Sequence, residues 1–185
     1  MRWFVGVVLA NNYLLGLDVG TSAVKALFID IQTKEIFKDE AKIATDDRTI
    51  EVEQNAVSYL DAIKEIATRN SEKINSVSAI GLSGHTPSVV CIDDEGVAVF
   101  PVMIWQDNRA NKEADDLKAR YGNPLPVIGT SLPWAASACP AKLFWLSRNR
   151  PEIVKKTRWV LQPKDYVGFH LTGKALSDPW STKGL

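Results

Sequence analysis

Apolar residues near the start of the chain form two runs that are separated by a short polar turn. Residues 13–18 and 23–31 make up these two runs, and residues 36–44 form a third run after a turn at 32–34. Apolar runs of this length, bounded by Gly, Thr, Ser and Asp, are typical of β-strands. The pattern therefore predicts a β-hairpin followed by a third strand.

The spacing of the apolar residues changes after Asn55, which is a favourable helix N-cap. Apolar side chains recur there at intervals of three and four, the period of a helix. These positions are Ala56, Tyr59, Leu60, Ile63, Ile66 and Ala67. Residues 77–83, 88–92 and 97–100 return to strand-like runs, separated by a Gly-His-Thr-Pro loop and by a turn at 93–96.

The second half of the chain has mainly helical patterns. Asp107 or Asn108 can cap a helix that ends near residue 121, and residues 122–139 read as a loop because they contain three prolines and two glycines. Pro140, Pro151 and Pro163 are each expected to begin a helix, the last of them ending at Gly173. The order of elements predicts an α/β fold, a mixed sheet with flanking helices, with no linker to a second domain.

The charge balance argues against two classes of partner. The chain has 22 basic and 22 acidic residues, so no overall field favours nucleic acid or an anionic membrane. Cys91, Cys139, His85 and His170 are isolated from one another in the sequence, which argues against a zinc site or a disulfide framework and favours the cytoplasm. Residues 1–12 read as an N-terminal extension; their apolar stretch is weakly similar to a signal peptide and too short to span a bilayer.

The turn between the first two strands carries candidate phosphate chemistry. We expect it to point the N–H groups of Gly20, Thr21 and Ser22 into one space, bordered by the Thr21 and Ser22 hydroxyls and the Asp18 carboxylate. Bunched amides and hydroxyls bind phosphate, and a neighbouring carboxylate suits Mg²⁺. The chain has neither a P-loop nor a dinucleotide-binding string. The alternative is an ordinary hairpin whose Gly, Thr and Ser serve only the turn.

Two further segments combine several polar groups. Residues 81–88 leave a strand and present His85 with hydroxyl groups, at a place where α/β sheets often bind ligands. The alternative there is a connecting loop with an exposed histidine. Residues 104–109 place Trp105, Asp107 and Arg109 close together, and an aromatic face beside polar side chains suits the recognition of sugar hydroxyls. The alternative there is a helix start with Asp107 as its cap.

These segments together resemble the FGGY family of carbohydrate kinases, from about Tyr13 to the end of the chain. Six strings match family motifs in the same order, and an ordered set is more specific than any single motif. They are residues 15–25, 53–55, 79–85, 101–109, 141–146 and 163–166, the last followed by Leu-Thr-Gly at 171–173.

The resemblance implies a ribonuclease H-like fold of the actin/hexokinase type and transfer of the γ-phosphoryl group of ATP to a sugar or polyol. By this resemblance Asp18 would hold Mg²⁺, and the phosphate path would be lined by Gly20, Thr21, Ser22 and Lys25. The sugar pocket would be shaped by Ser83, Gly84, His85, Thr86, Trp105, Asp107 and Arg109. Residues 85–88 match neither the glycerol kinase nor the xylulokinase signature, so pentuloses, pentoses, hexoses and their alcohols all stay open.

The family's members are much longer and have two domains. The resemblance therefore implies that residues 13–185 are an incomplete first domain, and that the general-base aspartate and the nucleotide domain would follow Leu185. We expect such a chain to be inactive alone and to self-associate, for example as a homodimer, through uncovered apolar surface. The alternatives are a non-catalytic sugar-binding or partner-binding module and, with less support from the motifs, an actin-like assembly protein.

Overall fold

The structure is a computed structural model that describes residues 12–47 and 49–181. The predicted N-terminal extension therefore lies outside the described residues, apart from Asn12. The strands are β1 (Tyr13–Val19), β2 (Ala23–Asp30), β3 (Ile36–Lys42), β4 (Glu53–Gln54), β5 (Val77–Gly84), β6 (Val90–Ile92), β7 (Val102–Met103) and β8 (Trp159–Leu161). The helices are α1 (Val57–Arg69), α2 (Ser71–Ile74), α3 (Asn111–Tyr121), α4 (Leu125–Ile128), α5 (Cys139–Asn149), α6 (Pro151–Lys156) and α7 (Pro163–Thr172).

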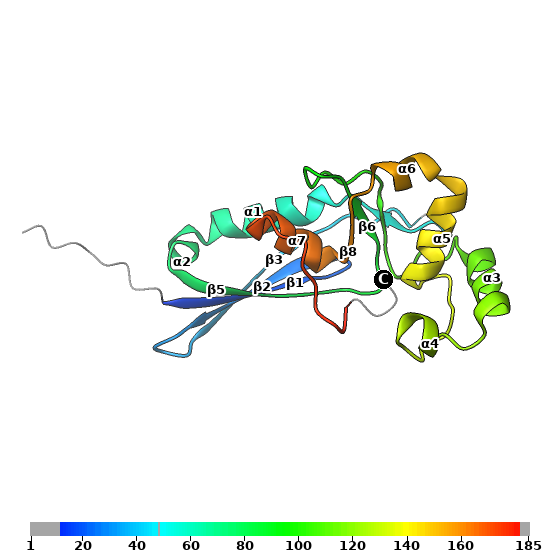
Figure 1. Cartoon of the computed structure of the whole chain (residues 1–185). Coiled ribbons are helices and arrows are strands. Elements are labelled where there is room, and N and C mark those ends of the chain that lie inside the picture. Colours follow the sequence, from blue (N-terminus) through cyan, green and yellow to red (C-terminus); the bar gives the residue numbers. More distant parts are fainter. Residues whose placement is uncertain (1–11, 48, 182–185) are drawn as a thin grey trace, which may run out of the picture.

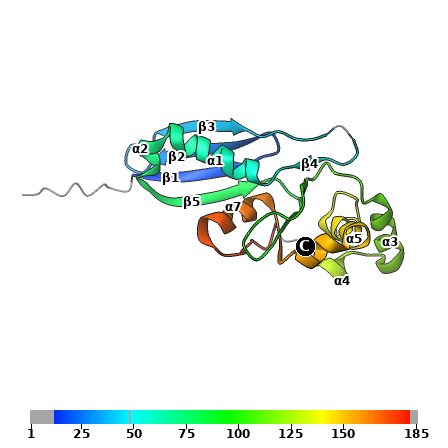
Figure 2. The same ribbon diagram turned by 90° about the horizontal axis from the view of Figure 1, so that it is seen from above.

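The main sheet has the strand order β3-β2-β1-β5. The β1–β2 and β2–β3 pairs are antiparallel, whereas β1 and β5 are parallel, so the predicted mixed sheet is confirmed. Leu15, Leu17 and Val19 alternate with residues that face the other side, and these three are buried. Helices α1 and α7 lie on that side of the sheet (Figures 1 and 2). The core therefore lies between the sheet and these two helices.

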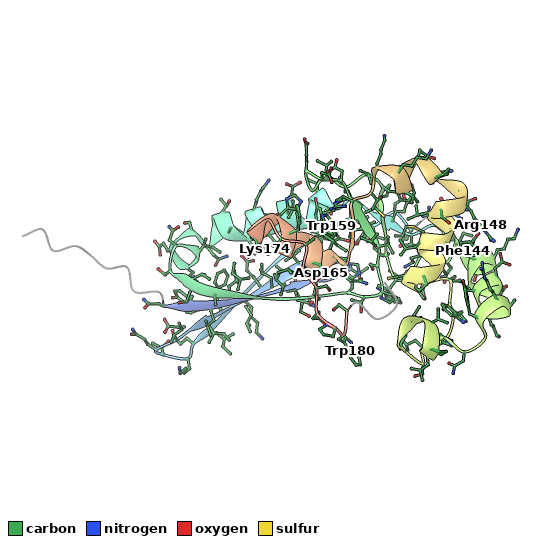
Figure 3. All side chains as sticks on the ribbon, viewed as in Figure 1. Phe144, Arg148, Trp159, Asp165, Lys174 and Trp180 are labelled. Atoms are coloured by element: carbon green, nitrogen blue, oxygen red, sulfur yellow. The ribbon has the colours of Figure 1, made fainter. Side chains whose placement is uncertain are left out.

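A second group of elements extends beyond one end of the main sheet (Figure 1). It contains the antiparallel pairs β4–β7 and β6–β8 together with α3, α5 and α6. Phe144 and Arg148 of α5 lie on the side toward α3 (Figure 3), and Arg148 forms an ion pair there with Asp116. Among the described residues, no helix is long and apolar enough to cross a membrane.

The structure differs from the predicted elements at several short segments. Residues 97–100 do not form a strand; only Ala98 makes an isolated bridge, to Ile92. The β8 strand was not predicted because its apolar run is only three residues long, and α4 interrupts the loop predicted at 122–139. The N-cap of α1 is Ala56, although Asn55 Oδ1 still accepts a hydrogen bond from the Val57 N–H (3.0 Å). Pro140 is the second residue of α5, while Pro151 and Pro163 begin helices as predicted.

Candidate functional site

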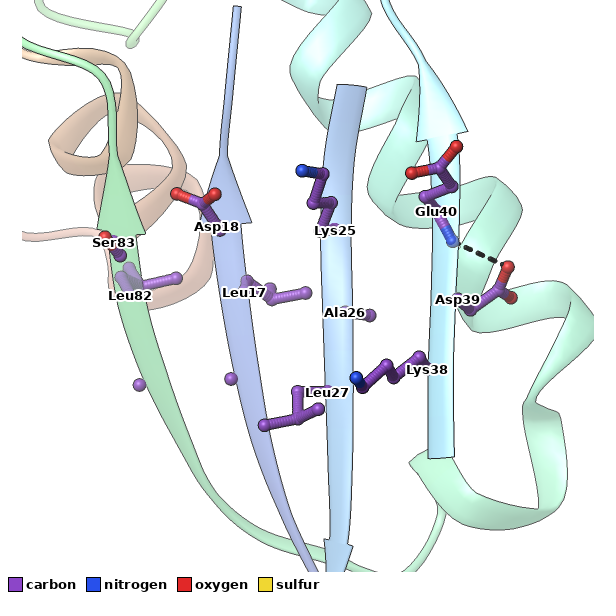
Figure 4. A pocket seen from close by; sticks show the side chains of 12 residues that line it. Leu17, Asp18, Lys25, Ala26, Leu27, Lys38, Asp39, Glu40, Leu82 and Ser83 are labelled. Atoms are coloured by element: carbon purple, nitrogen blue, oxygen red, sulfur yellow. Dashed lines mark hydrogen bonds between the residues drawn. The ribbon is translucent and has the colours of Figure 1, made fainter. Parts of the chain in front are cut away.

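Three predicted site residues lie side by side on the face of the sheet opposite to α1. In the strand register, Asp18 of β1 pairs with Lys25 of β2 on one side and with Ser83 of β5 on the other. All three are exposed and line a cavity of about 890 Å³ (Figure 4). The parallel β1–β5 pairing thus places two segments separated by more than sixty residues in the sequence at the same edge.

The cavity offers chemistry that suits a hydrated divalent cation. Asp18 contributes one exposed carboxylate, and the described residues contain no group of three or more His, Cys, Asp or Glu side chains arranged to hold a metal. Mg²⁺ commonly keeps several waters and binds through one or two carboxylates together with substrate phosphates. A single accessible carboxylate beside the Lys25 side chain therefore fits Mg²⁺ that arrives with a phosphate ligand.

The turn between β1 and β2, residues 20–22, which we call the phosphate turn, differs from the expected geometry at Gly20. Its N–H donates to the carbonyl oxygens of Asp18 and Ala23, both at 3.0 Å, so this amide closes the hairpin instead of facing an open space. A Cβ atom at Gly20 would lie only 2.8 Å from the Ala23 oxygen, which explains why the turn requires glycine. Ser22 is exposed and Thr21 is half-buried, so both residues of the turn are accessible to a ligand.

Trp105 connects the predicted sugar-binding segment with this turn. Its indole N–H donates to Thr21 Oγ1 at 3.1 Å, across 84 positions of sequence, and the side chain is 45% exposed. Gly84 and His85 approach the turn from β5, where the His85 N–H donates to the Val19 oxygen at 3.0 Å. Thr86, in contrast, is exposed in the loop beyond His85. The structure therefore brings together one residue from each of the three segments that the sequence had singled out.

A chain of hydrogen bonds runs behind this surface. His85 Nδ1 lies 2.9 Å from Ser88 Oγ, and His85 Nε2 lies 3.5 Å from Tyr59 Oη. The Tyr59 hydroxyl donates to Gln54 Oε1 (2.6 Å), and Gln54 Nε2 donates to the Thr21 oxygen. Because the Tyr59 proton goes to Gln54, we assign the His85 proton to Nε2, which leaves Nδ1 to accept from Ser88. This chain joins the His85 loop to the phosphate turn.

Sequence reasoning did not assign a site role to Tyr59 or Gln54. Tyr59 was predicted only as an apolar position of α1, and its ring is indeed completely buried. Gln54 belonged to a matched string, 53–55, which was the available signal. Burial raises the pKa of Tyr59, which keeps its hydroxyl protonated and available as a donor to Gln54.

Burial of His85 makes stability depend on pH. Burial, and secondarily the positive charge of Lys142, lower the pKa of His85 from 6.5 to about 4. The unfolded chain therefore binds a proton at a higher pH than the folded chain, so this group lowers the free energy of unfolding as pH falls from about 6.5 to 4. Allowing for partial solvent screening, we expect a loss of about 2 kcal/mol. Urea unfolding at pH 7 and pH 4.5 measures it, and His85→Gln should show a smaller loss than the wild type; an equal loss in both would contradict this assignment.

Asp107 and Arg109 occupy the interior and do not face the cavity. The Asp107 side chain is fully buried, and the Arg109 side chain is 4% exposed. Arg109 Nη2 donates to Asp107 Oδ2 and to Glu53 Oε1, both at 2.7 Å, and Asp107 Oδ2 also accepts from the Val52 N–H at 2.9 Å. Burial opposes the charged guanidinium, but these hydrogen bonds outweigh it and raise the pKa of Arg109. The helix-cap alternative for Asp107 is wrong, because α3 begins at Asn111 with Ala110 as its N-cap.

Comparison with known families gives one match that covers most of the chain. The N-terminal domain of the FGGY family of carbohydrate kinases matches residues 13–181. Among curated proteins, the xylulose kinase of Lactococcus lactis is 29% identical over 90% of this chain, and that of Staphylococcus xylosus is 28% identical over 93%. These matches cover 34% and 36% of the respective relatives, so the chain spans about a third of their length.

Solved structures give the same picture. A xyloylose kinase from Brucella ovis superposes with a TM-score of 0.82 and 29% identity, over 93% of this chain and 36% of that chain. A gluconate kinase from Lactobacillus acidophilus superposes with a TM-score of 0.83 and 26% identity, over 93% and 35%. The expected ribonuclease H-like fold of the actin/hexokinase type is therefore confirmed.

Proposed function

This chain belongs to the FGGY family of carbohydrate kinases, and on that premise we propose that it is the sugar-binding, N-terminal part of an ATP-dependent sugar or polyol kinase. The nucleotide domain and the general-base aspartate would belong to the two thirds of the relatives' length that the chain does not span. Residues 13–185 would accordingly form one part of a two-domain enzyme. The relatives' names make D-xylulose the first substrate to test, with gluconate as the second.

The contact between Trp105 and Thr21 is the observation that carries this proposal. It places an accessible aromatic side chain against the turn that we assign to phosphate, with His85 on the adjoining strand end. A phosphoryl acceptor must lie in line with the transferred group, so a sugar-binding surface has to adjoin a phosphate-binding turn. The contact between Trp105 and Thr21, which lie 84 positions apart in the sequence, supports such an arrangement.

We assign the roles of the individual side chains as follows. The Thr21 and Ser22 hydroxyls and the Lys25 ammonium would line the phosphate path, while Asp18 would hold Mg²⁺. Ser83, Gly84, His85, Thr86 and Trp105 would shape the sugar pocket. Asp107 and Arg109 would hold the Trp105 segment in place from the interior, since neither side chain is exposed enough to meet a sugar. Bound Mg²⁺ would neutralise charge that develops on the phosphate oxygens.

Sugar binding at Trp105 tests this function. We expect D-xylulose, or D-gluconate if the acid is the substrate, to shift the indole N–H signal of Trp105 in ¹⁵N-labelled protein. Trp105→Phe should weaken that sugar's binding about tenfold, which corresponds to about 1.4 kcal/mol. The phenyl ring offers the sugar a smaller aromatic face, and without the indole N–H it loses the hydrogen bond to Thr21 that holds the side chain against the turn. The matched control is Trp159→Phe, because Trp159 lies on β8, which pairs with β6 and contributes no residue to the proposed pocket.

Two outcomes would count against the proposal. If neither sugar, nor glycerol, moves the Trp105 signal of the folded chain, the assigned sugar pocket is wrong. If the 185-residue chain alone consumes ATP in a sugar-dependent manner at about 1–100 per second, an ordinary kinase rate, the nucleotide site cannot lie outside it. We expect no such ATP consumption by this chain alone.

A further inference from the structure

Lys142 is a completely buried lysine whose ammonium group, within the part of the chain that the structure describes, donates to main-chain oxygen atoms. It lies on α5, and its Nζ donates to the carbonyl oxygens of Pro87 (3.2 Å), Met103 (3.3 Å) and Ile104 (2.7 Å). An ammonium has three N–H donors and no acceptor, so the three carbonyl groups use its full donor capacity. Burial of a lysine is expensive unless it is paired in this way.

The three carbonyl groups belong to the two segments that we assign to the sugar pocket. Pro87 lies in the loop between His85 and Ser88, while Ile104 immediately precedes Trp105 and Met103 ends β7. The two segments also pair directly, since the Val89 N–H donates to the Met103 oxygen at 3.0 Å. One side chain from a third element, α5, therefore donates hydrogen bonds to both segments, next to the residues that we assign to the pocket.

We propose that Lys142 is a positioning residue, which sets the His85 loop and the Trp105 segment at a fixed separation through these three hydrogen bonds. This inference rests on the proposed function, which assigns the two segments to the sugar pocket. It goes beyond that function because it assigns the alignment of the pocket to a residue whose side chain is completely buried behind it. The geometry requires the protonated form, because a neutral amine has only two N–H groups for the three oxygens.

Burial of the Lys142 ammonium group makes this arrangement sensitive to mildly alkaline pH. Burial lowers the pKa of Lys142 to about 8, while Cys139 on the same helix and Asp107 act to raise it and Arg109 acts to lower it. The positive charge of Lys142 in turn contributes to the lowered pKa of His85. Above about pH 8, one of the three carbonyl groups should lose its hydrogen bond, and the Trp105 segment should shift relative to Thr21.

Local repositioning of Trp105 can be distinguished from unfolding in this pH range. Because the unfolded chain holds its lysine proton up to about pH 10.5, the folded chain releases this proton first. The sign of the linkage is then that this group raises, and does not lower, the free energy of unfolding between about pH 8 and 10.5. A change at Trp105 in this interval therefore reports local repositioning and not unfolding.

The experiment follows the indole N–H signals of the six tryptophans in ¹⁵N-labelled protein between pH 6.5 and 9.5, without any sugar. Trp105→Phe assigns the signal of interest. We expect the Trp105 signal of the wild type to titrate with a midpoint near pH 8. In Lys142→Gln, which offers two donors and no charge, the signal should lie near the wild-type alkaline position and should not titrate. Lys142→Met, which offers no donor, should shift it further.

Lys155→Met is the matched control, because Lys155 is exposed on the neighbouring helix α6; its Trp105 signal should titrate as in the wild type. A wild-type signal that does not move, or one that moves equally in Lys142→Gln, would overturn the inference. If Lys142→Met fails to fold, the wild-type titration and Lys142→Gln still decide the question. None of these measurements uses a sugar, so they are independent of whether the proposed substrates bind.

Discussion

Replacement of Asp107 by alanine is expected to lower the free energy of unfolding by about 3 kcal/mol, within the range of 3–5 kcal/mol that is typical of breaking a buried ion pair. The Asp107 carboxylate is fully buried and accepts hydrogen bonds from Arg109 and from the Val52 N–H. Its removal leaves a guanidinium that is only 4% exposed with fewer partners. Glu53 still contacts Arg109, which places the expected loss at the low end of that range. Urea unfolding at pH 7 measures the change.

The matched control is Asp116→Ala, which removes the carboxylate from an exposed ion pair with Arg148. Exposed pairs contribute about 0–1 kcal/mol, so this variant should unfold close to the wild type. Equal effects of the two substitutions would show that the burial of Asp107 has no energetic consequence. The Trp105 signal should also broaden or move in Asp107→Ala alone, since Asp107 holds the segment that begins with Trp105.

Gly20→Ala is expected to have the second largest effect, a destabilisation of about 1–3 kcal/mol, as for overpacking at a rigid site. The added Cβ atom would lie 2.8 Å from the main-chain oxygen of Ala23, and this oxygen cannot move aside without opening the hairpin. The Gly20 N–H would then lose its bonds to Asp18 and Ala23. Because Thr21 is the next residue, its contact with the Trp105 indole should be displaced as well, which the Trp105 N–H signal detects.

Gly81→Ala provides the control for this variant. Gly81 lies on β5 in the same sheet, and a Cβ atom there would have no neighbour within 4 Å. Alanine also restricts the unfolded chain more than glycine does, so the variant should be neutral or slightly more stable. Gly20→Ala with wild-type stability and an unchanged Trp105 signal would contradict the proposed geometry of the turn.

The main sheet and its covering helices could be predicted from the sequence because each has a clear local period. The runs at 13–18 and 23–31 differ from β1 and β2 by only one residue at their ends, and α7 ends at Thr172 with Gly173 after it, as predicted. The short elements could not be predicted in this way. β8 has only three residues, and its pairing with β6 depends on a partner about seventy positions away.

The chemistry of the candidate site was predictable only in part, as the fates of individual residues show. Asp18, Thr21 and Trp105 stood out because unusual residue types follow an apolar run. Asp107 and Arg109 stood out for the same reason, but the sequence does not distinguish a pocket residue from a buried ion pair. Lys142 was part of a matched string and carried no signal of its own, since lysine on a helix is ordinarily exposed.

The sequence by itself determined the long strands and helices, the position of the turn between β1 and β2, and the set of segments that carry polar chemistry. Each of these depends on residues within a few positions of one another. Only the tertiary structure decided that the Trp105 indole donates to Thr21 and that the Gln54 amide donates to the Thr21 oxygen, 33 positions away. It also decided that Lys142 of α5 donates to the main chain of both the His85 loop and the Trp105 segment. Such contacts depend on how the sheet packs against its helices, because burial, which local sequence does not encode, determines whether a charge faces solvent or a carbonyl oxygen.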